Sequence, residues 1–418
     1  DPQVAESDRI LRKCVHCGFC TATCPTYLLT GDELDGPRGR IYLAKDMLEK
    51  NRAADATTVK HLDRCLTCLS CMTTCPSGVH YMHLIDHARQ HIERTYRRPF
   101  GERALRALLA FVLPHTGRFR LALRAAALAR PFRALLPARL RGLIDTARTA
   151  RSAKPEAVAR LPQNATARHC RVALLPGCVQ PALRPQINEA TVRLLNRHGV
   201  EVVVAKGTGC CGALVHHLGR EHESLAQAKA DIDAWTREIE SGGLDAIIVT
   251  ASGCGTMLKD YGFLFRNDPA YAEKAARVAS LARDVTEVLA EVEFAHNASC
   301  VPESLRVAYH SACSLQHGQR LHSLPADLLR KAGFTVLDIP ESHICCGSAG
   351  TYSLLQPEMS TQLRERKARN IESVEPTVIA TGNIGCLTQI AQATAIPIVH
   401  TVELLDWAAG GPKPAGLR

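Results

Sequence analysis

The hydrophobic positions after residue 170 alternate between short β-branched runs and amphipathic stretches. The runs RVALL, VEVVV and AIIV are separated by segments such as INEATVRLLNRHG, and the same order returns as RVAY, FTVLDI and TVIA around LPADLLRKAG. Strands that alternate with helices in this way form a parallel sheet with helices outside. The sequence therefore predicts two repeated α/β units, over residues 166–297 and 298–418.

The first 95 residues carry a helical pattern instead. RIYLAKDMLEK and ATTVKHLDRCLTC each place apolar residues on one helical face. Residues 96–165 interleave apolar and basic residues, and Pro114, Pro131 and Pro137 break this linker into short predicted helices. The predicted fold class is α+β and multidomain, with a helical domain over residues 1–95, the linker, and the two parallel-sheet units.

The composition supports several domains and indicates the cellular compartment of the protein. The 418-residue chain is 46% hydrophobic, which is enough to build more than one core. No apolar run reaches the roughly 20 residues that span a bilayer, and the opening DPQVAESDRI lacks the basic and apolar regions of a signal peptide. We expect a cytoplasmic protein. In a reducing compartment, eighteen cysteines favour metal or redox chemistry over disulfides.

Eight of these cysteines lie in two runs of identical spacing, CVHCGFCTATCP and CLTCLSCMTTCP. Disulfides between residues three apart would restrain the fold little, zinc prefers two separated C-x2-C pairs, and chance does not explain the recurrence. Both runs match the bacterial ferredoxin pattern C-x2-C-x2-C-x3-C-P, in which a short loop wraps an iron–sulfur cluster. Two [4Fe–4S] clusters are therefore predicted in residues 1–95.

In two-cluster ferredoxins the fourth cysteine of each run binds the other cluster, and the proline turns the chain away. Under this rule, cluster one is predicted to bind to Cys14, Cys17, Cys20 and Cys75. Cluster two is predicted to bind to Cys65, Cys68, Cys71 and Cys24.

Each α/β unit also carries four cysteines at matching offsets. A single cysteine precedes a Cys-Cys pair by 32 residues in both units, and the last cysteine follows the pair by 43 and 40 residues, which indicates a duplication. Each cysteine follows a predicted strand, and the carboxyl ends of parallel strands meet in one crevice. We expect two quartets of converging thiols, Cys178, Cys210, Cys211 and Cys254 in the first repeat and Cys313, Cys345, Cys346 and Cys386 in the second.

The chemistry of the quartets stays open between additional iron–sulfur clusters, in one or both repeats, and buried unligated thiols. Small residues after each pair, in TGCCGA and HICCGSAG, would let the backbone approach a cluster. His310 and His343 lie near the second quartet, either as donors to a cluster sulfur or a quinone carbonyl, or as structural histidines. Cys170 and Cys300 lie outside both frames and are predicted to have no ligand role.

The linker holds most of the net charge of +10. Between Arg94 and Lys154, fifteen Lys or Arg accompany two acidic residues. Three interpretations are open: solvated amphipathic helices, a surface for anionic lipid head groups, or a surface for an acidic partner subunit. Nucleic acid is not expected as a partner, because no recognition motif accompanies the charge. The arginines that would test the lipid interpretation are Arg118, Arg120, Arg124, Arg130 and Arg133.

A family resemblance rests on the stretches CVHCGFCTATCPTY, GDELDGPRGRIYL, HLDRCLTC, TCPSGV, GCCGA, TASGCG, SHICCGSAGTY and NIGC. Together they resemble redox subunits that join a two-cluster ferredoxin domain to two cysteine-rich (CCG) domains, as in heterodisulfide reductase, anaerobic glycerol-3-phosphate dehydrogenase and lactate-utilisation proteins. The resemblance is close to the iron–sulfur subunits of glycolate oxidase (glycolate dehydrogenase) and covers almost the whole chain. It implies a complex in which flavin subunits oxidise glycolate to glyoxylate and this subunit passes electrons towards a membrane quinone.

One departure from the wider group bears on the reaction. Heterodisulfide reductases use a fifth cysteine in each repeat for a non-cubane cluster, whereas Ala251 and Asn383 stand at the corresponding positions here. Four thiols per repeat favour an ordinary four-cysteine cluster, and they favour electron transfer over a heterodisulfide or thiol–disulfide reductase. A subunit for another 2-hydroxy acid, such as lactate, remains an alternative.

The glycolate-oxidising site is expected on a partner subunit. We identify no G-x-G-x-x-G after a strand, no P-loop, no H-E-x-x-H, and no flavin or NAD site on this chain. Removal of hydride from a hydroxy acid requires one of those cofactors. We expect a cytoplasmic, peripheral protein at the inner face of the cell membrane, in contact with flavin-containing subunits, a quinone and the anionic membrane surface.

Overall fold

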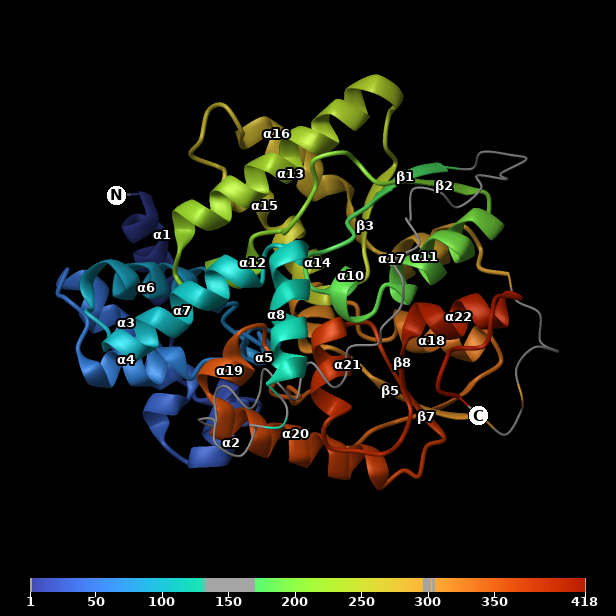
Figure 1. Ribbon diagram of the computed structural model, residues 1–418. Coiled ribbons are helices and arrows are strands. Elements are labelled where there is room, and N and C mark those ends of the chain that lie inside the picture. The colour runs from blue at the N-terminus through green and yellow to red at the C-terminus, as the bar shows by residue number, and fades with distance from the viewer. Residues whose placement is uncertain (1, 130, 132–169, 296–301, 303–304, 418) are drawn as a thin grey trace.

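The computed structural model describes residues 2–129, 131, 170–295, 302 and 305–417 of the chain. It confirms the predicted fold class: a helical N-terminal domain, the head, is followed by two α/β units that each contain a parallel four-stranded sheet. In Figure 1 the head lies on the left in blue, the first repeat lies above in green and yellow, and the second lies below in orange and red.

The head is built from helices whose apolar faces meet in one core. Ile10, Met47, Leu62, Leu84 and Ile92 are among its fully buried side chains. Pro25 and Pro37 start two of the helices, where a missing N–H costs nothing. The helices are α1 (Pro2–Leu11), α2 (Pro25–Thr30), α3 (Pro37–Glu49), α4 (Ala56–Asp63), α5 (Ser70–Thr74) and α6 (Tyr81–Thr95), with 3-10 turns at Phe19–Thr21 and Glu33–Asp35.

Two linker helices cross the front of the molecule between the head and the repeats (Figure 1). They are α7 (Phe100–Val112) and α8 (Thr116–Leu128), and the break between them falls at the predicted Pro114. The linker after residue 131, and with it Arg133 and the predicted break at Pro137, lies outside the described residues, as does Arg130.

The two repeats share one topology. The first sheet has the strand order β2-β1-β3-β4 and the second β6-β5-β7-β8, and every strand pair is parallel. The strands are β1 (Cys170–Leu174), β2 (Val200–Val203), β3 (Ala246–Val249), β4 (Ala282–Asp284), β5 (Arg306–His310), β6 (Thr335–Leu337), β7 (Val378–Thr381) and β8 (Ile398–His400). The edge strands β4 and β8 were not predicted from the sequence, because each is too short to carry a β-branched run.

Helices cover both sheets in the same order in each repeat, except that α15 and α16 of the first repeat have no counterpart in the second. The first repeat has α10 (Gln180–Leu183), α11 (Gln186–Arg197), α12 (Ala213–His216), α13 (Glu221–Gly242), α14 (Ser252–Lys259), α15 (Tyr261–Leu264), α16 (Ala272–Leu281) and α17 (Val285–Glu291). The second has a π-helix (Ser314–Gly318), α18 (Leu324–Lys331), α19 (Tyr352–Leu355), α20 (Pro357–Glu372), α21 (Ile384–Ile390) and α22 (Thr401–Ala408).

The repeats pack against each other around one shared hydrophobic core. Helix α11 of the first repeat contacts α22 of the second, and helix α17 of the first repeat contacts α18 of the second. Buried Asp406 on α22 accepts a hydrogen bond from Arg193 Nη2 at 2.8 Å and pairs with Arg197, both on α11. The predicted domain boundaries at residues 165 and 297 fall in ranges outside the described residues. Among the helices that are described, none is both long and apolar enough to cross a membrane.

Candidate metal centres

The thiols predicted for cluster one line a single cavity of about 440 Å³ in the head. Cys17 is exposed, and the other three, Cys14, Cys20 and Cys75, are half-buried. Cys71, predicted for the other cluster, lies on the same wall. Cys14, Cys17 and Cys20 come from one loop and Cys75 follows α5, so the structure brings the two cysteine runs together as expected.

The thiols predicted for cluster two line a second cavity, of about 340 Å³. Cys24 enters from the first run, and Cys65, Cys68 and Cys71 belong to the second. This site is more enclosed than the first, because Cys24, Cys65 and Cys68 are all buried.

The two cysteine loops adopt the same unusual backbone conformation. His16 and Gly18 in the first loop have φ angles of 52° and 85°, and Thr67 and Leu69 at the same positions of the second have 52° and 64°. Residues other than glycine hold such angles only where the surroundings enforce them, and this occurs at functional sites. Turned in this way, successive backbone N–H groups form a concave surface that attracts anions. The loops therefore suit a negatively charged cluster.

Burial makes these thiols poor acids on their own. It raises the pKa of Cys20 to about 11 and the pKa of Cys68 well above the ordinary value of a thiol. A coordinating metal deprotonates a thiol outright, and four thiolates per site are the usual ligand set of a [4Fe–4S] cluster. The donor set, the loops and the two cavities thus fit two such clusters.

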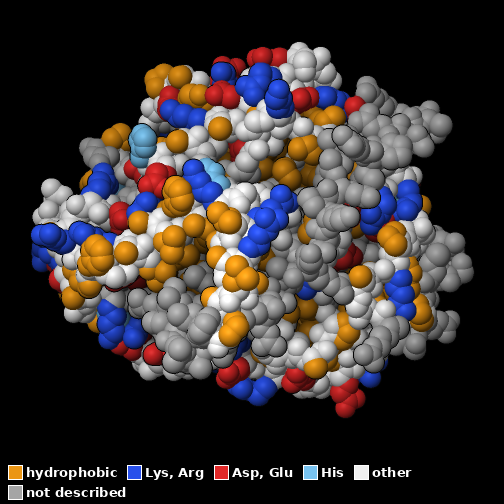
Figure 2. Space-filling model, viewed as in Figure 1, with side chains coloured by type: hydrophobic (Ala, Val, Ile, Leu, Met, Phe, Trp, Pro, Cys, Tyr) orange, Lys and Arg blue, Asp and Glu red, His pale blue; other side chains and the backbone are white. Residues whose placement is uncertain are grey.

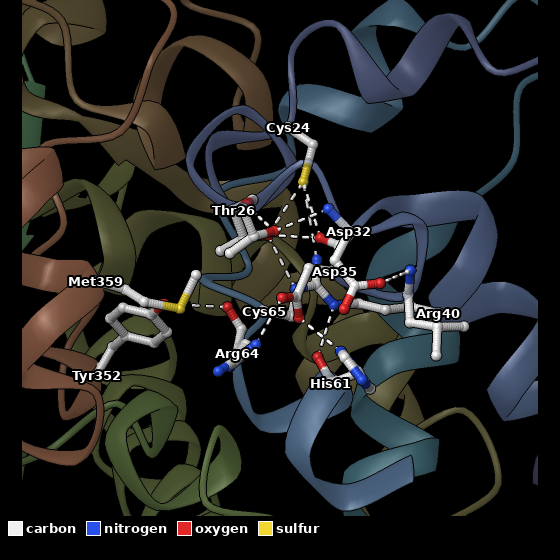
Figure 3. Close-up of polar contacts among 12 residues, drawn as sticks. Cys24, Thr26, Asp32, Asp35, Arg40, His61, Arg64, Cys65, Tyr352 and Met359 are labelled. Carbon is white, nitrogen blue, oxygen red and sulfur yellow. Dashed lines mark hydrogen bonds and ion pairs between the residues drawn. The ribbon is translucent and has the colours of Figure 1, made fainter. Parts of the chain in front are cut away.

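A buried cation lies beside the second site (Figure 3). Arg40 is 2% exposed, and its Nη1 lies 3.8 Å from Cys24 Sγ. Its Nε donates to the His61 carbonyl at 2.7 Å, and its Nη2 donates to Thr26 Oγ1 at 2.9 Å. Hydrogen bonds and positive charge at the sulfurs raise the reduction potential of an iron–sulfur cluster. Arg40 therefore suits a role in setting the potential of cluster two.

Asp35 holds this cation in place from the centre of the same network (Figure 3). Its carboxylate is fully buried and lies 3.7 Å from Arg40, 2.8 Å from His61 Nδ1 and 2.7 Å from Arg64 Nη1. Two arginines against one carboxylate leave the network with net positive charge. No role was predicted for any of these residues from the sequence, although GDELDGPRGRIYL contains both Asp35 and Arg40.

The four thiols of each repeat converge at the carboxyl ends of the strands, as predicted. In the second repeat Cys313 Sγ lies 3.7 Å from Cys345 Sγ, and Cys346 and Cys386 lie within 4.8 Å of each other. In the first repeat the contacts run in the same order, from Cys178 to Cys210, then to Cys211 and Cys254. Cys170 begins β1 at the opposite end of the sheet, and Cys300 lies outside the described residues.

A glycine follows each cysteine pair because the chain passes close to a helix there. Gly212 and Gly347 have φ angles of 88° and 85°, and a Cβ on them would lie 2.8 Å from the Ser224 carbonyl and 2.6 Å from the Ser360 carbonyl. In the first repeat the stretch GTGCCG follows β2 with the G-x-G-x-x-G spacing of dinucleotide sites, so the expectation that no such motif follows a strand was wrong. The helix after it, α12, has only four residues, and the thiol pair occupies the turn.

Polar groups of the second repeat approach its thiols. Gly347 N donates to Cys345 Sγ at 3.4 Å, and Asn383 Nδ2 donates to Cys386 Sγ at 3.4 Å. Asn383 thus donates a hydrogen bond to the Cys386 sulfur from the position at which heterodisulfide reductases have the fifth cysteine. The ring of His310 lies beside Cys346 and Cys386. His343 takes part through its backbone, because its carbonyl accepts a hydrogen bond from His317 Nε2 at 3.2 Å.

The second repeat lies directly against cluster two's cavity. Cys68 and Cys345 share one small buried cluster with Leu66 and Tyr352, and Cys313 packs against it. His317 Nδ1 also lies 2.8 Å from Thr73 Oγ1 on α5 of the head. The first repeat's thiols come next, because Ser252 and Ser314, which lie close to Cys254 and Cys313 in the chain, hydrogen bond at 2.6 Å. The second site of the head therefore adjoins the quartet of the second repeat, and the two repeats contact each other beside their quartets.

Family comparisons agree with this arrangement and define the class of protein. Residues 10–79 match the 4Fe-4S dicluster domain, and residues 172–259 and 307–391 each match the cysteine-rich domain, which makes the chain an iron–sulfur protein with two cysteine-rich repeats. It is 46% identical over 96% of its length to the glycolate oxidase iron-sulfur subunit of Escherichia coli strain K12, covering 95% of that protein. The chain belongs to the family of glycolate oxidase iron–sulfur subunits.

More distant relatives have related names. The probable glycolate oxidase iron-sulfur subunit of Bacillus subtilis strain 168 is 31% identical over 96% of this chain and 94% of its own length. Lactate utilization protein A of Bacillus licheniformis is 30% identical over 56% of this chain and 99% of its own length.

Proposed function

We propose that this chain is the electron-transfer subunit of a glycolate dehydrogenase complex and carries electrons from a flavin-containing subunit to a quinone. The observation that carries the proposal is the series of neighbouring thiol sites that runs from the exposed loop at Cys17, through the enclosed site at Cys68, to the second repeat at Cys345. Electron transfer needs such closely spaced centres, and iron–sulfur clusters supply the one-electron chemistry.

The ligand sets in this proposal follow the two cavities. Cluster one would be held by Cys14, Cys17, Cys20 and Cys75, and cluster two by Cys24, Cys65, Cys68 and Cys71. Each cysteine-rich repeat would hold one further iron–sulfur centre on its quartet. The site that oxidises glycolate would lie on the flavin subunit, since glycolate chemistry requires a hydride acceptor.

An apolar cavity between the repeats supports a quinone as the acceptor. It has a volume of about 700 Å³, and it borders both quartets because Val179 follows Cys178 and Gly385 precedes Cys386. Binding pockets for small ligands are concave and combine apolar side chains with a few polar groups. Half of its lining residues have apolar side chains, namely Leu113, Phe119, Val179, Leu183, Leu214, Leu354 and Ile384.

The outer face of α7 and α8 supports docking at the inner face of the cell membrane. Phe111 is 59% exposed, Leu121 67% and Leu128 80%, and hydrophobic side chains gather over these helices in Figure 2, with basic side chains among them. Arg118 and Arg124 are exposed there. Arg106 is not available to lipid, because it is buried and its Nη2 donates to Asp63 at 2.9 Å. Amphipathic helices that expose both apolar and basic side chains bind anionic membranes.

Reconstitution tests the function as a whole. The chain alone should not oxidise glycolate, and the chain with its flavin partner should reduce a short-chain quinone. Cys68→Ser should lower the iron content by roughly four atoms and abolish quinone reduction, while glycolate still reduces the flavin. Unchanged iron content would contradict the ligand assignment, and reduction of a disulfide by the chain alone would favour the reductase alternative.

Filling the cavity tests the acceptor site. Leu214→Trp and Leu354→Trp replace half-buried side chains that line it, so each should weaken quinone binding at least tenfold while reduction of a water-soluble dye continues. Leu121→Trp, on the exposed face of α8, is the matched control. Normal quinone kinetics in both cavity variants would place the acceptor elsewhere.

A further inference from the structure

The side chain of His310 is buried beside two thiols, and its ring has no hydrogen-bond partner among the described residues. The side chain lies at the carboxyl end of β5 and is 2% exposed. One of its ring nitrogens and the sulfurs of Cys346 and Cys386 all lie within 4.8 Å of one another. Neither nitrogen bonds to any group among the described residues.

This arrangement is costly unless something binds the imidazole. Buried polar groups are almost always hydrogen-bonded, and an unpaired one destabilises the folded state. Histidine and cysteine are also the two side chains that most often bind iron and zinc through nitrogen and sulfur. A metal at this position would satisfy the nitrogen and the two thiols at once.

The first repeat shows that the fold does not require a histidine here. Leu175 occupies the equivalent position, three residues before Cys178 as His310 is three residues before Cys313. The strand registers agree with this equivalence, since Leu174 pairs with Ile248 on β3 as Tyr309 pairs with Ala380 on β7. Leu175 is 2% exposed, so an apolar side chain fills the same buried space.

A buried charge also differs between the two repeats. Seven residues after the serine that contacts the CCG glycine, the first repeat has Asp231 and the second has Lys367. Both side chains are 1% exposed. Asp231 accepts a hydrogen bond from Gly209 N and faces Cys210, whereas Lys367 donates to the Glu341 carbonyl at 2.7 Å and faces Cys345 and Cys346. The second site is therefore the more electropositive of the two.

We propose that His310, in place of one of the four thiolates, is a ligand of the iron centre in the second repeat, which thus has three sulfur donors and one nitrogen donor, whereas that of the first repeat is sulfur alone. The inference rests on the proposed function, which places an iron–sulfur centre in this repeat. Histidine in place of thiolate raises the potential of an iron–sulfur centre, as in Rieske proteins, and Lys367 acts in the same direction. Electrons that leave cluster two would accordingly be held preferentially at the second repeat.

Pulsed EPR of the intact complex tests the nitrogen ligand directly. With ¹⁵N-labelled histidine, the signal that is lost in Cys386→Ser should show a strong ¹⁵N coupling. His310→Leu, which copies the first repeat, should remove this coupling and lower the potential of the centre by about 60 mV or more, a tenfold change in its one-electron equilibrium. His343→Leu is the matched control and should change neither property.

Two outcomes would overturn the inference, and they differ from a failure of the proposed function. A centre that contains iron but shows no ¹⁵N coupling in the wild-type complex would exclude His310 as a ligand. The same holds if the coupling persists in His310→Leu. If Cys386→Ser changes neither the iron content nor any EPR signal, the second repeat holds no iron, and its part of the proposed function fails as well.

Discussion

The Tyr352 hydroxyl donates a hydrogen bond of 3.1 Å to the Arg64 carbonyl and so ties the second repeat to the head (Figure 3). Arg64 immediately precedes Cys65, and Tyr352 lies six residues after Cys346. The same arginine donates to Asp35 at 2.7 Å, within the network that holds Arg40. One contact therefore connects the loop of cluster two, its buried cation and the thiol turn of the second repeat.

Tyr352→Phe should loosen this contact. The change leaves the Arg64 carbonyl without this partner, which costs about 1 kcal/mol. We expect faster hydrogen–deuterium exchange across residues 64–69 and in α19, with little change in iron content. Tyr42→Phe is the matched control, because it removes the same group from a side chain that is 64% exposed and should not change the exchange. Unaltered exchange in Tyr352→Phe would mean that apolar packing alone holds the two parts together.

Arg40→Gln should lower the reduction potential of cluster two. The buried guanidinium lies 3.8 Å from Cys24 Sγ, and loss of its charge disfavours the extra electron of the reduced cluster. We expect a decrease of about 60 mV or more in a redox titration monitored by EPR, on samples with full iron content. Arg40→Lys keeps the charge and should retain most of the potential. Arg38→Gln, a half-exposed arginine at the first cavity, should leave cluster two unchanged, and equal shifts in both variants would contradict a local effect.

His400 should make the contact between the repeats sensitive to acid. Burial lowers the pKa of His400 to about 4, its Nε2 donates to the Thr250 carbonyl at 2.8 Å, and its Nδ1 accepts from Val402 N. The pKa of an unfolded histidine is about 6.5, so the unfolded state binds more protons between these values. Stability from this group is fully present above pH 6.5 and is lost as the pH falls towards 4, by about 2 kcal/mol at pH 5.

The measurement is the change in thermal stability between pH 7.5 and pH 5 for the wild type and for His400→Gln. Glutamine keeps a donor and an acceptor but does not titrate, so the variant should lose less stability over this range. Comparison with the wild type cancels the acid sensitivity of the iron–sulfur centres, which both proteins share. Parallel pH profiles would show that His400 does not contribute.

Charge reversal on α7 and α8 should release the complex from anionic vesicles. Arg103, Arg118 and Arg124 are exposed, and each basic residue near such a surface contributes about 1 kcal/mol. Their joint replacement by Glu should weaken binding at least about a hundredfold at low salt. Reversal of exposed Lys60, Arg277 and Arg369 changes the net charge equally elsewhere and is the matched control. Equal losses in both triple variants would show that only net charge matters, and no loss would favour a subunit contact for this face.

The amino-acid sequence by itself determined the features that depend on neighbours in the chain. These features are the two ferredoxin runs, the helices of the head and the β-branched runs of the repeats. They are local patterns, because the spacing of apolar residues decides which side chains share one face of a helix or strand. The duplicated cysteine offsets likewise predicted that four thiols meet in each repeat, because strand ends in a parallel sheet lie together.

Only the tertiary structure decided which side chains surround these thiols. Arg40 and Lys367 look like ordinary surface charges in the sequence, and they are buried because segments distant in the chain close over them. The sequence placed both His310 and His343 near the second quartet, but only the structure shows that the ring of His310 lies beside Cys346 and Cys386 with no partner among the described residues. The short strands β4 and β8 also escaped prediction, because three residues carry too little pattern and their pairing is long-range. Spacing thus fixes where metal ligands can meet, and packing sets the charge that they experience.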